Sequence, residues 1–296
     1  MRYAVILNPV SGGGKALNIL PRLYRWISKN GIDFEFFCTT SPGDGYRQGR
    51  YIRRERFDRA VVLGGDGTIN EVGSALLGSD MVLGVLPGGK GNDFFKMIGT
   101  NGRLDSAFHT AFFGAPHEID VGIINKKPFF NSVGVGFDAE VAEIVVKNEK
   151  ASGMWAYLLA VFKAWRNLHP VTIEIDLDGV ILRRDITLVC IGNGRSSGGG
   201  FYLTPSARID DGLFDVCVIQ ELSRGKIFRY LPRTLNGSHI RLDDTAIYRS
   251  KKVTIKSKSK LPVHVDGEPL EPSPRVIEFK FNEEKILVAM ENKDEK

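Results

Sequence analysis

Residues 63–72 read LGGDGTINEV and directly follow the apolar run RAVVL at residues 59–63. The run predicts a strand, and the stretch after it is compatible with a helix. Three glycines around Asp66 leave backbone N–H groups accessible at the start of that helix, where an anion is favoured. A tight turn explains one or two glycines, but not three around an aspartate that is followed by Thr68 and Asn70. We interpret the loop as a phosphate site.

The same strand–loop–helix pattern extends on both sides of this loop, over the first 120 residues. Strands joined by single helices predict a parallel sheet, because parallel neighbours need a crossover connection. Ligands bind such sheets at the carboxyl ends of their strands. Four loops should meet at that edge: NPVSGGGK (8–15), CTTSPGDG (38–45), GGDGT (64–68) and LPGGKGND (86–93). The helices expected between the strands cover residues 16–29, 45–55, 68–77 and 92–98.

From about Asp120 the pattern changes to many short alternating runs separated by Gly, Asn, Asp and Pro. Such runs predict an antiparallel sandwich or barrel, here with helical inserts at about 139–168 and 223–235. The expected fold is therefore an α/β nucleotide-binding domain with a parallel sheet, at residues 1–122, followed by a mainly antiparallel β-sandwich domain at 123–296. The last residues could return to the first domain.

Composition and charge limit the classes of function. The 296 residues are 43% hydrophobic and carry a formal net charge of +5, which suits anionic partners without choosing among them. Cys38, Cys190 and Cys217 are far apart and lack C-x-x-C spacing, so neither a disulfide framework nor a zinc site is indicated. The apolar stretch MWAYLLAVFKAW (154–165) is too short to span a bilayer, and is either core or a membrane-facing helix. We expect a cytoplasmic protein that touches a membrane transiently.

Two further glycine-rich segments fail the test for a Walker A loop. Residues 84–91, GVLPGGKG, have the required spacing but place Gly91 where a hydroxyl should bind magnesium. The segment SGGGK at 11–15 lacks the spacing. Neither segment alone identifies a nucleotide site.

Seven segments together, however, occur in the order seen in one family: NPVSGGGK, TTSPGDG, GGDGTINEV, LPGGKGNDFFKMIG, NSVGVGFDAEVA, GNGRSSGGGFYLTPSARIDDGLFDV and VDGEPL. Over nearly its whole length the chain resembles the bacterial diacylglycerol kinase-like lipid kinases, which are related to sphingosine and ceramide kinases and distantly to NAD kinases. The resemblance implies ATP and Mg²⁺ as cofactors. It also implies transfer of the γ-phosphate to the hydroxyl of a lipid such as diacylglycerol, giving phosphatidic acid, in a cleft between the two domains.

The resemblance also implies particular site residues. Nucleotide-binding groups would be Asn8, Pro9, Val10, Ser11, Gly12, Thr40, Gly64, Gly65, Asp66, Gly67, Thr68, Ile69 and Asn70. A structural Mg²⁺ would be bound by Asp211 and by the backbone carbonyls of Arg208 and Leu213. An Asp-Asp-Gly hairpin turn would use the same residues, and both interpretations stay open.

Glu268 in HVDGEPL is similar to the family's catalytic base, and Asp66 would belong to the network around the nucleotide-bound Mg²⁺. Asp66 is also the alternative base. Extended geometry would put His264, Asp266 and Glu268 on one strand face, although an exposed polar face explains that pattern equally well.

One residue departs from the family's pattern. The family usually reads Leu-Pro-x-Gly-Thr-x-Asn-Asp-Phe, and Lys90 stands at the threonine. We expect its ammonium to contact a nucleotide phosphate as a point charge; the alternative is a side chain that points into water.

Rival functions are a kinase of a soluble hydroxyl compound, similar to NAD kinase, and a nucleotide-binding regulator without turnover. Expected partners are ATP, a lipid alcohol and a peripheral membrane surface, with no nucleic acid; a homodimer stays open.

Overall fold

The computed structural model describes residues 1–98, 102–147, 154–166 and 169–291. Its chain divides into two compact units, Met1–Asp120 with Glu283–Lys296, and Val121–Asn282. Each unit has its own sheet, and each is described here by itself.

The first unit contains a six-stranded sheet in the order β2-β1-β3-β4-β17-β5. The strands are β1 (Tyr3–Leu7), β2 (Phe34–Cys38), β3 (Arg59–Gly64), β4 (Val82–Pro87), β5 (Ala115–Ile119) and β17 (Ile286–Met290). All neighbours are parallel except β5, which pairs antiparallel with β17. Every residue of β1 and β3 is buried, as expected for central strands covered on both faces. The predicted parallel sheet is confirmed, with one antiparallel edge strand.

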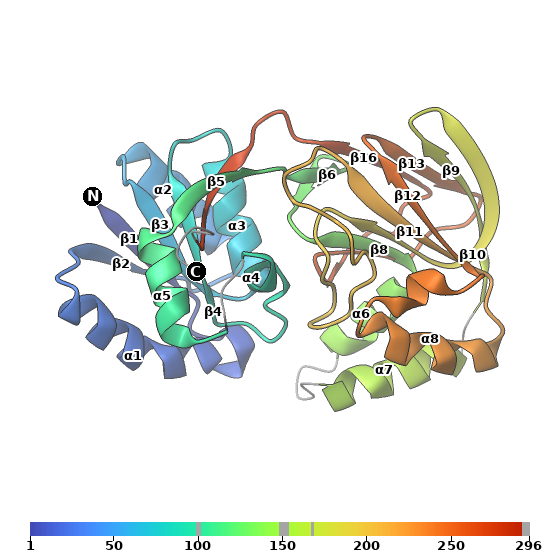
Figure 1. Ribbon diagram of the computed structural model, residues 1–296, viewed down its shortest axis with the longest axis horizontal. Coiled ribbons are helices and arrows are strands. Elements are labelled where there is room, and N and C mark those ends of the chain that lie inside the picture. Colours follow the sequence, from blue (N-terminus) through green and yellow to red (C-terminus); the bar gives the residue numbers. More distant parts are fainter. Residues whose placement is uncertain (99–101, 148–153, 167–168, 292–296) are drawn as a thin grey trace. The chain divides into compact units, whose positions relative to one another are not determined.

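Within the described residues of this unit, five helices cover the sheet: α1 (Lys15–Lys29), α2 (Asp44–Arg54), α3 (Asp66–Leu76), α4 (Asp93–Met97) and α5 (Leu104–Phe113). Across the sheet, the chain moves one way from β1 through α1 to β2. It then moves the opposite way, through α2 to β3 and through α3 to β4. Right-handed crossovers therefore put α1 on one face and α2 with α3 on the other, and α2 indeed packs on α3 while α1 contacts α5 (Figure 1). The strand order reverses between β1 and β3, and ligands bind at such switch points.

Helix α5 was not expected from the sequence. Its residues LDSAFHTAFF are apolar around much of the helix, so no clear amphipathic period marks it. The buried Arg59 guanidinium donates to the carbonyls of Ala111 (3.3 Å) and Gly114 (3.0 Å), which satisfies the C-terminal end of this helix.

The second unit is one curled eleven-stranded sheet in which all neighbours are antiparallel. The long strand β10 (Val180–Gly192) pairs over its first half with β9 (Val171–Leu177) and over its second half with β8 (Ser132–Gly136) and β11 (Phe214–Gln220). The sheet thereby folds into two layers. The other strands are β6 (Gly122–Ile124), β7 (Lys127–Phe129), β12 (Thr245–Ser250), β13 (Val253–Ser257), β14 (Val263–Val265), β15 (Glu268–Pro269) and β16 (Val276–Phe281).

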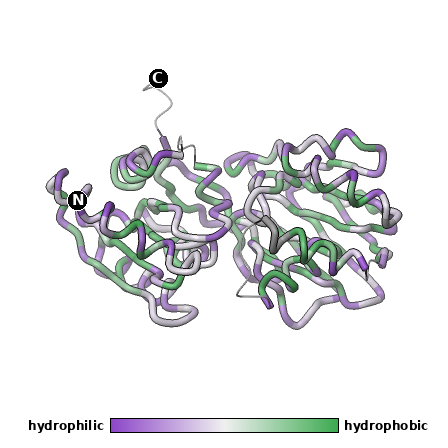
Figure 2. The backbone as a smooth tube through the Cα atoms, turned by 90° about the horizontal axis from the view of Figure 1, so that it is seen from below, coloured by the Kyte–Doolittle hydropathy of each residue, from purple (hydrophilic) through white to green (hydrophobic). Residues whose placement is uncertain are grey.

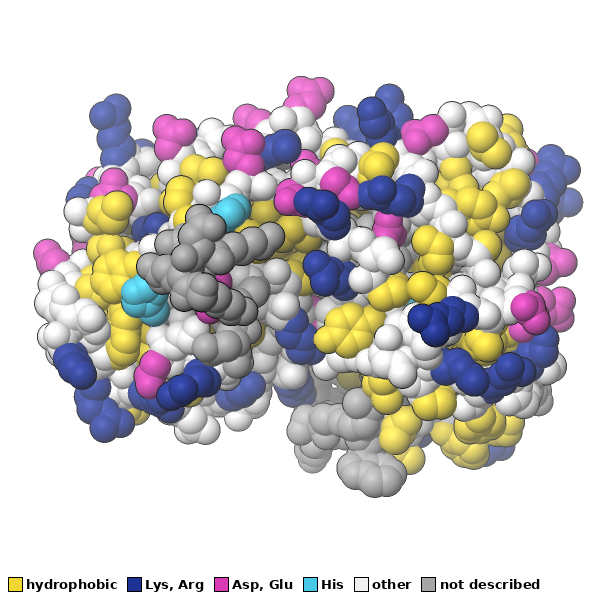
Figure 3. Space-filling model, viewed as in Figure 1, with side chains coloured by type: hydrophobic (Ala, Val, Ile, Leu, Met, Phe, Trp, Pro, Cys, Tyr) yellow, Lys and Arg dark blue, Asp and Glu magenta, His cyan; other side chains and the backbone are white. Residues whose placement is uncertain are grey.

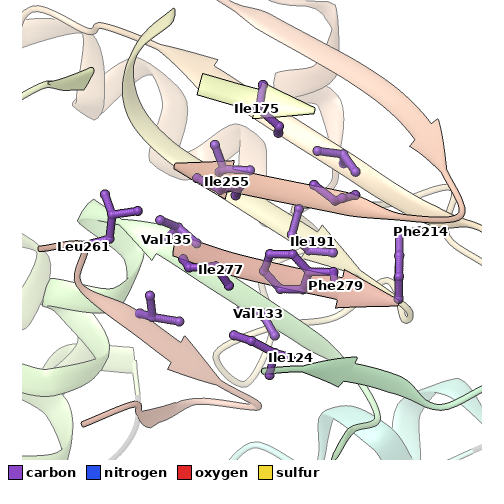
Figure 4. Packing of buried hydrophobic residues seen from close by; sticks show 14 of the residues in the cluster. Ile124, Val133, Val135, Ile175, Ile191, Phe214, Ile255, Leu261, Ile277 and Phe279 are labelled. Carbon is purple, nitrogen blue, oxygen red and sulfur yellow. The ribbon is translucent and has the colours of Figure 1, made fainter. Parts of the chain in front are cut away.

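A continuous apolar core fills the space between these two layers (Figure 4). Val189 and Ile191 of β10 point into it, whereas Leu188 and Cys190 point to the opposite face. That opposite face is covered by the helices α6 (Phe137–Lys147), α7 (Met154–Arg166) and α8 (Ile227–Thr234). The mainly antiparallel second domain and its helical inserts are confirmed, although residues 148–153 and 167–168 of the first insert lie outside the described residues. Figure 2 shows the apolar segments concentrated in the strands and in parts of these helices.

Candidate functional site

Three glycine-rich loops touch at the carboxyl edge of the first sheet. A Cβ added to Gly89 would lie 2.5 Å from the Cα of Gly65, and one added to Gly12 would lie 2.6 Å from the carbonyl oxygen of Gly88. These glycines are therefore required by the close approach of the loops themselves. Gly13 and Gly14 are different: their φ angles are 69° and 91°, and an added Cβ would meet nothing within 4 Å. The loops thus form a compact edge with one open stretch of bare backbone.

Asn8 and Thr68 fasten the loop after β1 to helix α3. The Asn8 amide donates to the Thr68 hydroxyl (2.9 Å) and accepts from the backbone N–H of Val10 (3.2 Å). Thr68 is buried. These two predicted nucleotide contacts therefore shape the loop. Of the other predicted contacts, Val10 is 78% exposed, whereas Ile69 is 1% exposed and donates its N–H to the carbonyl of Gly65. The Ile69 side chain belongs to the core.

Asp66 begins α3 and links two of the loops. Its Oδ1 accepts the backbone N–H of Phe94 in α4 (2.9 Å). In the loop after β4, Asn92 adopts a positive φ of 52° and bonds both the N–H (2.7 Å) and the carbonyl (3.0 Å) of Gly89. The accessible N–H groups at this helix start suit a phosphate. The half-buried Asp66 carboxylate suits Mg²⁺, which prefers oxygen ligands. The residues here fit a magnesium nucleotide.

Lys90 lies in this same loop, between Gly89 and Gly91. Its side chain is exposed and makes no hydrogen bond or ion pair with the residues that the structure describes. The ammonium is therefore free to meet an anion.

The loop after β2 is organised by two acidic side chains that the sequence analysis missed. Thr40 donates both its N–H (2.7 Å) and its hydroxyl (2.6 Å) to Asp44 Oδ2, and these bonds hold the pKa of Asp44 well below its usual range. Glu71 of α3 accepts the N–H groups of Gly43 (2.8 Å) and Gly45 (2.9 Å). With both donors engaged, Thr40 can offer a nucleotide only acceptor atoms and its methyl group. The sequence signal that could have revealed part of this arrangement is Asp44, because an aspartate just before a helix-compatible run is typical of a helix start.

The segment around Glu268 is a tight hairpin, so the prediction of one extended strand is wrong. Val265 pairs with Glu268 across a two-residue turn, in which Asp266 and Gly267 have φ angles of 49° and 88°. Positive φ at both central residues is what a type I′ turn requires, and Asp-Gly is a strong signal for it. His264, Asp266 and Glu268 therefore do not share a face: His264 is buried, Asp266 lies in the turn, and Glu268 is exposed on β15.

Asp266 and His264 anchor this hairpin. The Asp266 carboxylate accepts three consecutive backbone N–H groups, from Phe130 (2.9 Å), Asn131 (2.8 Å) and Ser132 (3.0 Å).

His264 Nδ1 accepts the N–H of Gly267 (3.2 Å), which leaves Nε2 to donate to Asp138 Oδ2 (2.8 Å) in a neutral imidazole. Glu268 itself has no hydrogen bond or ion pair with any described residue. A rigid hairpin thus presents a carboxylate that is available to accept a proton.

The Asp-Asp-Gly turn does not fit a magnesium site as it is arranged here. Asp211 Oδ1 accepts the N–H of Leu213 (3.1 Å), and Oδ2 forms an ion pair with Arg249, which also bonds the buried Asp215 (3.1 Å). Among the described residues no group of three or more His, Cys, Asp or Glu side chains could hold a metal. Arg249 supplies the positive charge at this turn, and a cation coordinated through Arg208, Asp211 and Leu213 stays a prediction that requires Arg249 to move.

The two units match two family models. Residues 2–124 match the diacylglycerol kinase catalytic domain, and residues 131–287 match the YegS C-terminal NAD kinase beta sandwich-like domain. A diacylglycerol kinase of Bacillus subtilis (strain 168) is 31% identical over 273 residues, which cover 90% of this chain and 89% of the relative. The chain belongs to the diacylglycerol kinase family. It is therefore a lipid kinase enzyme, and the family resemblance seen in the sequence is confirmed.

Other members of the diacylglycerol kinase family agree with this assignment. A diacylglycerol kinase of Mycobacterium tuberculosis (strain H37Rv) is 29% identical over 283 residues, covering 93% of this chain and 91% of the relative. The crystal structure of a putative diacylglycerol kinase from Bacillus anthracis matches with a TM-score of 0.82 at 23% identity, over 98% of this chain and 95% of that one, which supports the fold. No helix in the described part of this kinase is long and apolar enough to cross a membrane.

Proposed function

We propose that the protein transfers the γ-phosphate of ATP, with Mg²⁺, to the hydroxyl of a diacylglycerol-like lipid and releases ADP and phosphatidic acid. The observation that carries the proposal is the edge of the first sheet. There the bare backbone of Gly13 and Gly14, the helix start at Asp66 and the free ammonium of Lys90 belong to adjoining loops. The N–H groups at the start of α3, the Asp66 carboxylate and the Lys90 cation suit a magnesium nucleotide. Gly13 and Gly14 contribute open space rather than donors, because their own N–H groups already donate to the carbonyls of Val10 and Ser11.

The proposed chemistry is an in-line displacement at the γ-phosphorus. The lipid hydroxyl oxygen forms a bond to phosphorus, the bond from phosphorus to the β,γ-bridging oxygen breaks, and ADP leaves. Glu268 takes the hydroxyl proton, because its exposed carboxylate has no other partner among the described residues. Bound Mg²⁺ would neutralise charge on the phosphates, with Asp66 as the side chain that holds or orients it. Phosphoryl transfer otherwise depends mostly on positioning.

A peripheral membrane contact fits the outer surface of α7 and α8. Leu159, Phe162 and Phe228 are 61%, 47% and 52% exposed, and Lys163 and Arg166 lie beside the first two on α7. Figure 3 shows apolar and basic side chains together over this region, at the lower right of the view. Exposed apolar side chains with neighbouring cations are typical of surfaces that bind anionic lipid. The stretch MWAYLLAVFKAW thus supplies both core residues, such as Val161, and an outward apolar surface.

The test is a labelled-ATP assay with vesicles that contain diacylglycerol, ceramide, a sphingoid base or a polyprenol, and with NAD in solution. We expect labelled phosphatidic acid, no product when EDTA is added, and a faster reaction on vesicles that contain an anionic lipid. If NAD is the only compound that is phosphorylated, the protein is a kinase of a soluble substrate. ATP binding without any product would make it a regulator, and equal rates on neutral and anionic vesicles would rule out the basic surface as the membrane contact.

A further inference from the structure

A groove on the outer surface of the second unit has no part in the chemistry proposed above. It lies where the start of β9, the first half of β10 and the segment after β13 come together, and it has a volume of about 950 Å³. Residues 169–174, Arg183 and residues 256–259 line it, and none of them belongs to the glycine-rich loops or to the hairpin that carries Glu268. Pockets that bind small ligands have volumes of about 300–1,000 Å³.

The strands present charged side chains to this groove because their alternate residues are buried in the core. Ile175 of β9 and Ile255 of β13 are cross-strand neighbours in the core between the two layers (Figure 4). Glu174 and Lys256, one position away, therefore point to the outer face. Arg183 and Lys256 lie directly opposite Glu174, on the two strands that flank β9. Three charged side chains thus form one row across the groove.

The groove carries more positive charge than its own carboxylate can neutralise. One oxygen of Glu174 accepts two hydrogen bonds from the Arg183 guanidinium (3.1 and 3.0 Å), and the other oxygen lies 4.0 Å from the Lys256 ammonium. Lys258 makes no hydrogen bond or ion pair with the residues that the structure describes. Glu174 is the only carboxylate among the described residues of the wall, so one negative charge meets three cations.

Hydrogen bonds fix the segment that carries Lys258. Ser257 donates its hydroxyl to the carbonyl of Thr172 on β9 (3.2 Å), and Ser259 donates its N–H to the Ser257 hydroxyl (3.3 Å). Lys258 lies between these two residues. Pro170 and Val171 add apolar surface to the same wall. An inorganic phosphate ion would fill only a small part of this volume, so the groove suits an anion with an organic body.

We propose that this groove binds the phosphate group of an organic phosphate. Arg and Lys are the side chains that recognise phosphate, Arg through its planar fork and Lys as a point charge. Two sources offer this chemistry: a soluble phosphate ester and the headgroup of an anionic phospholipid. The second source is included because His169 follows Arg166 of α7 by three residues, which span at most about 11 Å. The inference is independent of the proposed function, because the phosphate here is bound and not transferred.

Glycerol 3-phosphate added to ¹⁵N-labelled protein tests the soluble source. We expect saturable shifts of the amide signals of Lys256, Ser257 and Lys258, and weaker binding as salt is added. Because one exposed ion pair changes an equilibrium constant by up to about fivefold, and Lys258→Glu replaces an attraction with a repulsion, this variant should raise the dissociation constant by about tenfold. Lys280→Glu is the matched control, since it makes the same change at an exposed position of β16 outside the groove.

Vesicles test the headgroup source. Co-sedimentation of the protein with phosphatidylcholine vesicles should increase when phosphatidylglycerol is included. Lys258→Glu should reduce that increase, whereas Lys280→Glu should not. Lys256→Gln is a second groove variant with the same expected direction, and the melting temperature of each variant shows whether it is folded.

The two assays distinguish the sources of the phosphate. Binding of glycerol 3-phosphate assigns the groove to a soluble ester, and binding seen only on vesicles that contain phosphatidylglycerol assigns it to a headgroup. The proposal is overturned if neither assay detects binding, or if Lys258→Glu and Lys280→Glu behave alike. Binding that Lys90→Met abolishes would also overturn it, because the anion would then occupy the glycine-rich loops of the first unit. None of these measurements uses turnover, so a failure here leaves the proposed function standing.

Discussion

His264 Nε2 lies 2.8 Å from Asp138 Oδ2, although 126 residues separate them in the chain. The contact is possible because Gly134 lies beneath both side chains: a Cβ on Gly134 would be 2.2 Å from the imidazole nitrogen and 2.5 Å from the carboxylate oxygen. The hydrogen bond joins helix α6 to the hairpin that presents Glu268. The position of the candidate base thus depends on a glycine in a neighbouring strand.

Gly134→Ala should separate Asp138 from His264 and lower kcat, because the added methyl group occupies the space of their hydrogen bond. Two buried polar groups would lose their partners, and each such loss costs about 1–3 kcal/mol of stability. The expected results are a lower melting temperature and a slower phosphoryl transfer with unchanged ATP affinity. Gly225→Ala is the matched control, because a Cβ there meets nothing within 4 Å. Equal behaviour of the two variants would show that the glycine is not required.

Glu268→Gln should reduce turnover by about 10²–10⁴-fold, the usual cost of losing a general base. Its ATP dissociation constant should stay close to wild type, because the carboxylate acts on the acceptor hydroxyl. Asp66→Asn should impair both quantities. Single-turnover rates and calorimetric ATP titrations measure the two quantities. A nearly normal rate in Glu268→Gln would show that Glu268 is not the catalytic base and would leave Asp66 as the candidate.

Lys90→Met should raise the ATP dissociation constant by roughly tenfold or more, since a charge-assisted hydrogen bond contributes about 1.5–3 kcal/mol. Lys90→Thr, which installs the family's usual residue, should recover part of the loss. Added salt should weaken wild type more than either variant, because only wild type has the exposed cation. Calorimetry at low salt is decisive: the same affinity in all three proteins would mean that Lys90 points into water.

Glu140 should make the melting temperature fall as pH rises. Burial, and to a lesser degree Glu143, raises the pKa of Glu140 to about 7 from an ordinary value of 4.5. The folded protein therefore holds this proton more tightly than the unfolded chain does, and the stabilisation is lost as pH increases from about 4.5 through about 7. Glu140→Gln should remove that part of the slope in melting curves between about pH 5 and pH 8. Parallel curves for the two proteins would contradict the assignment.

Arg249 should make the fold insensitive to metal removal, because it already neutralises Asp211 and Asp215. We expect EDTA to shift the wild-type melting temperature by less than about 2 °C, which corresponds to under about 1 kcal/mol at this size. Arg249→Gln should melt lower and regain stability when Mg²⁺ is added. Arg208→Gln, which removes an exposed partner of Asp210, is the control. A wild-type protein that EDTA destabilises strongly would instead establish a structural cation at the turn.

The sequence predicted the first sheet and its loops well, because apolar runs ending in glycine clusters are strong local signals. It predicted the hairpin at Glu268 wrongly. Val263 and Val265 alternate with polar residues as in a continuous strand, and that period outweighed the Asp-Gly turn signal. The remaining features depend on contacts between distant residues. Neither the Asp138–His264 bond nor the Arg249–Asp211 pair has a local pattern, since the partners meet only when separate strands and helices pack together.

The last described strand has a consequence for the order of folding during synthesis. β17 lies between β4 and β5, and so completes a sheet whose other strands are made more than 160 residues earlier. Until Ile286–Met290 leave the ribosome, the first unit lacks an interior strand and keeps an open edge on β4, which is a template for wrong pairing. The second unit, contiguous in the chain, can fold before the first is complete. A fragment that stops at residue 124 should therefore aggregate, and a peptide of the β17 sequence should suppress that aggregation.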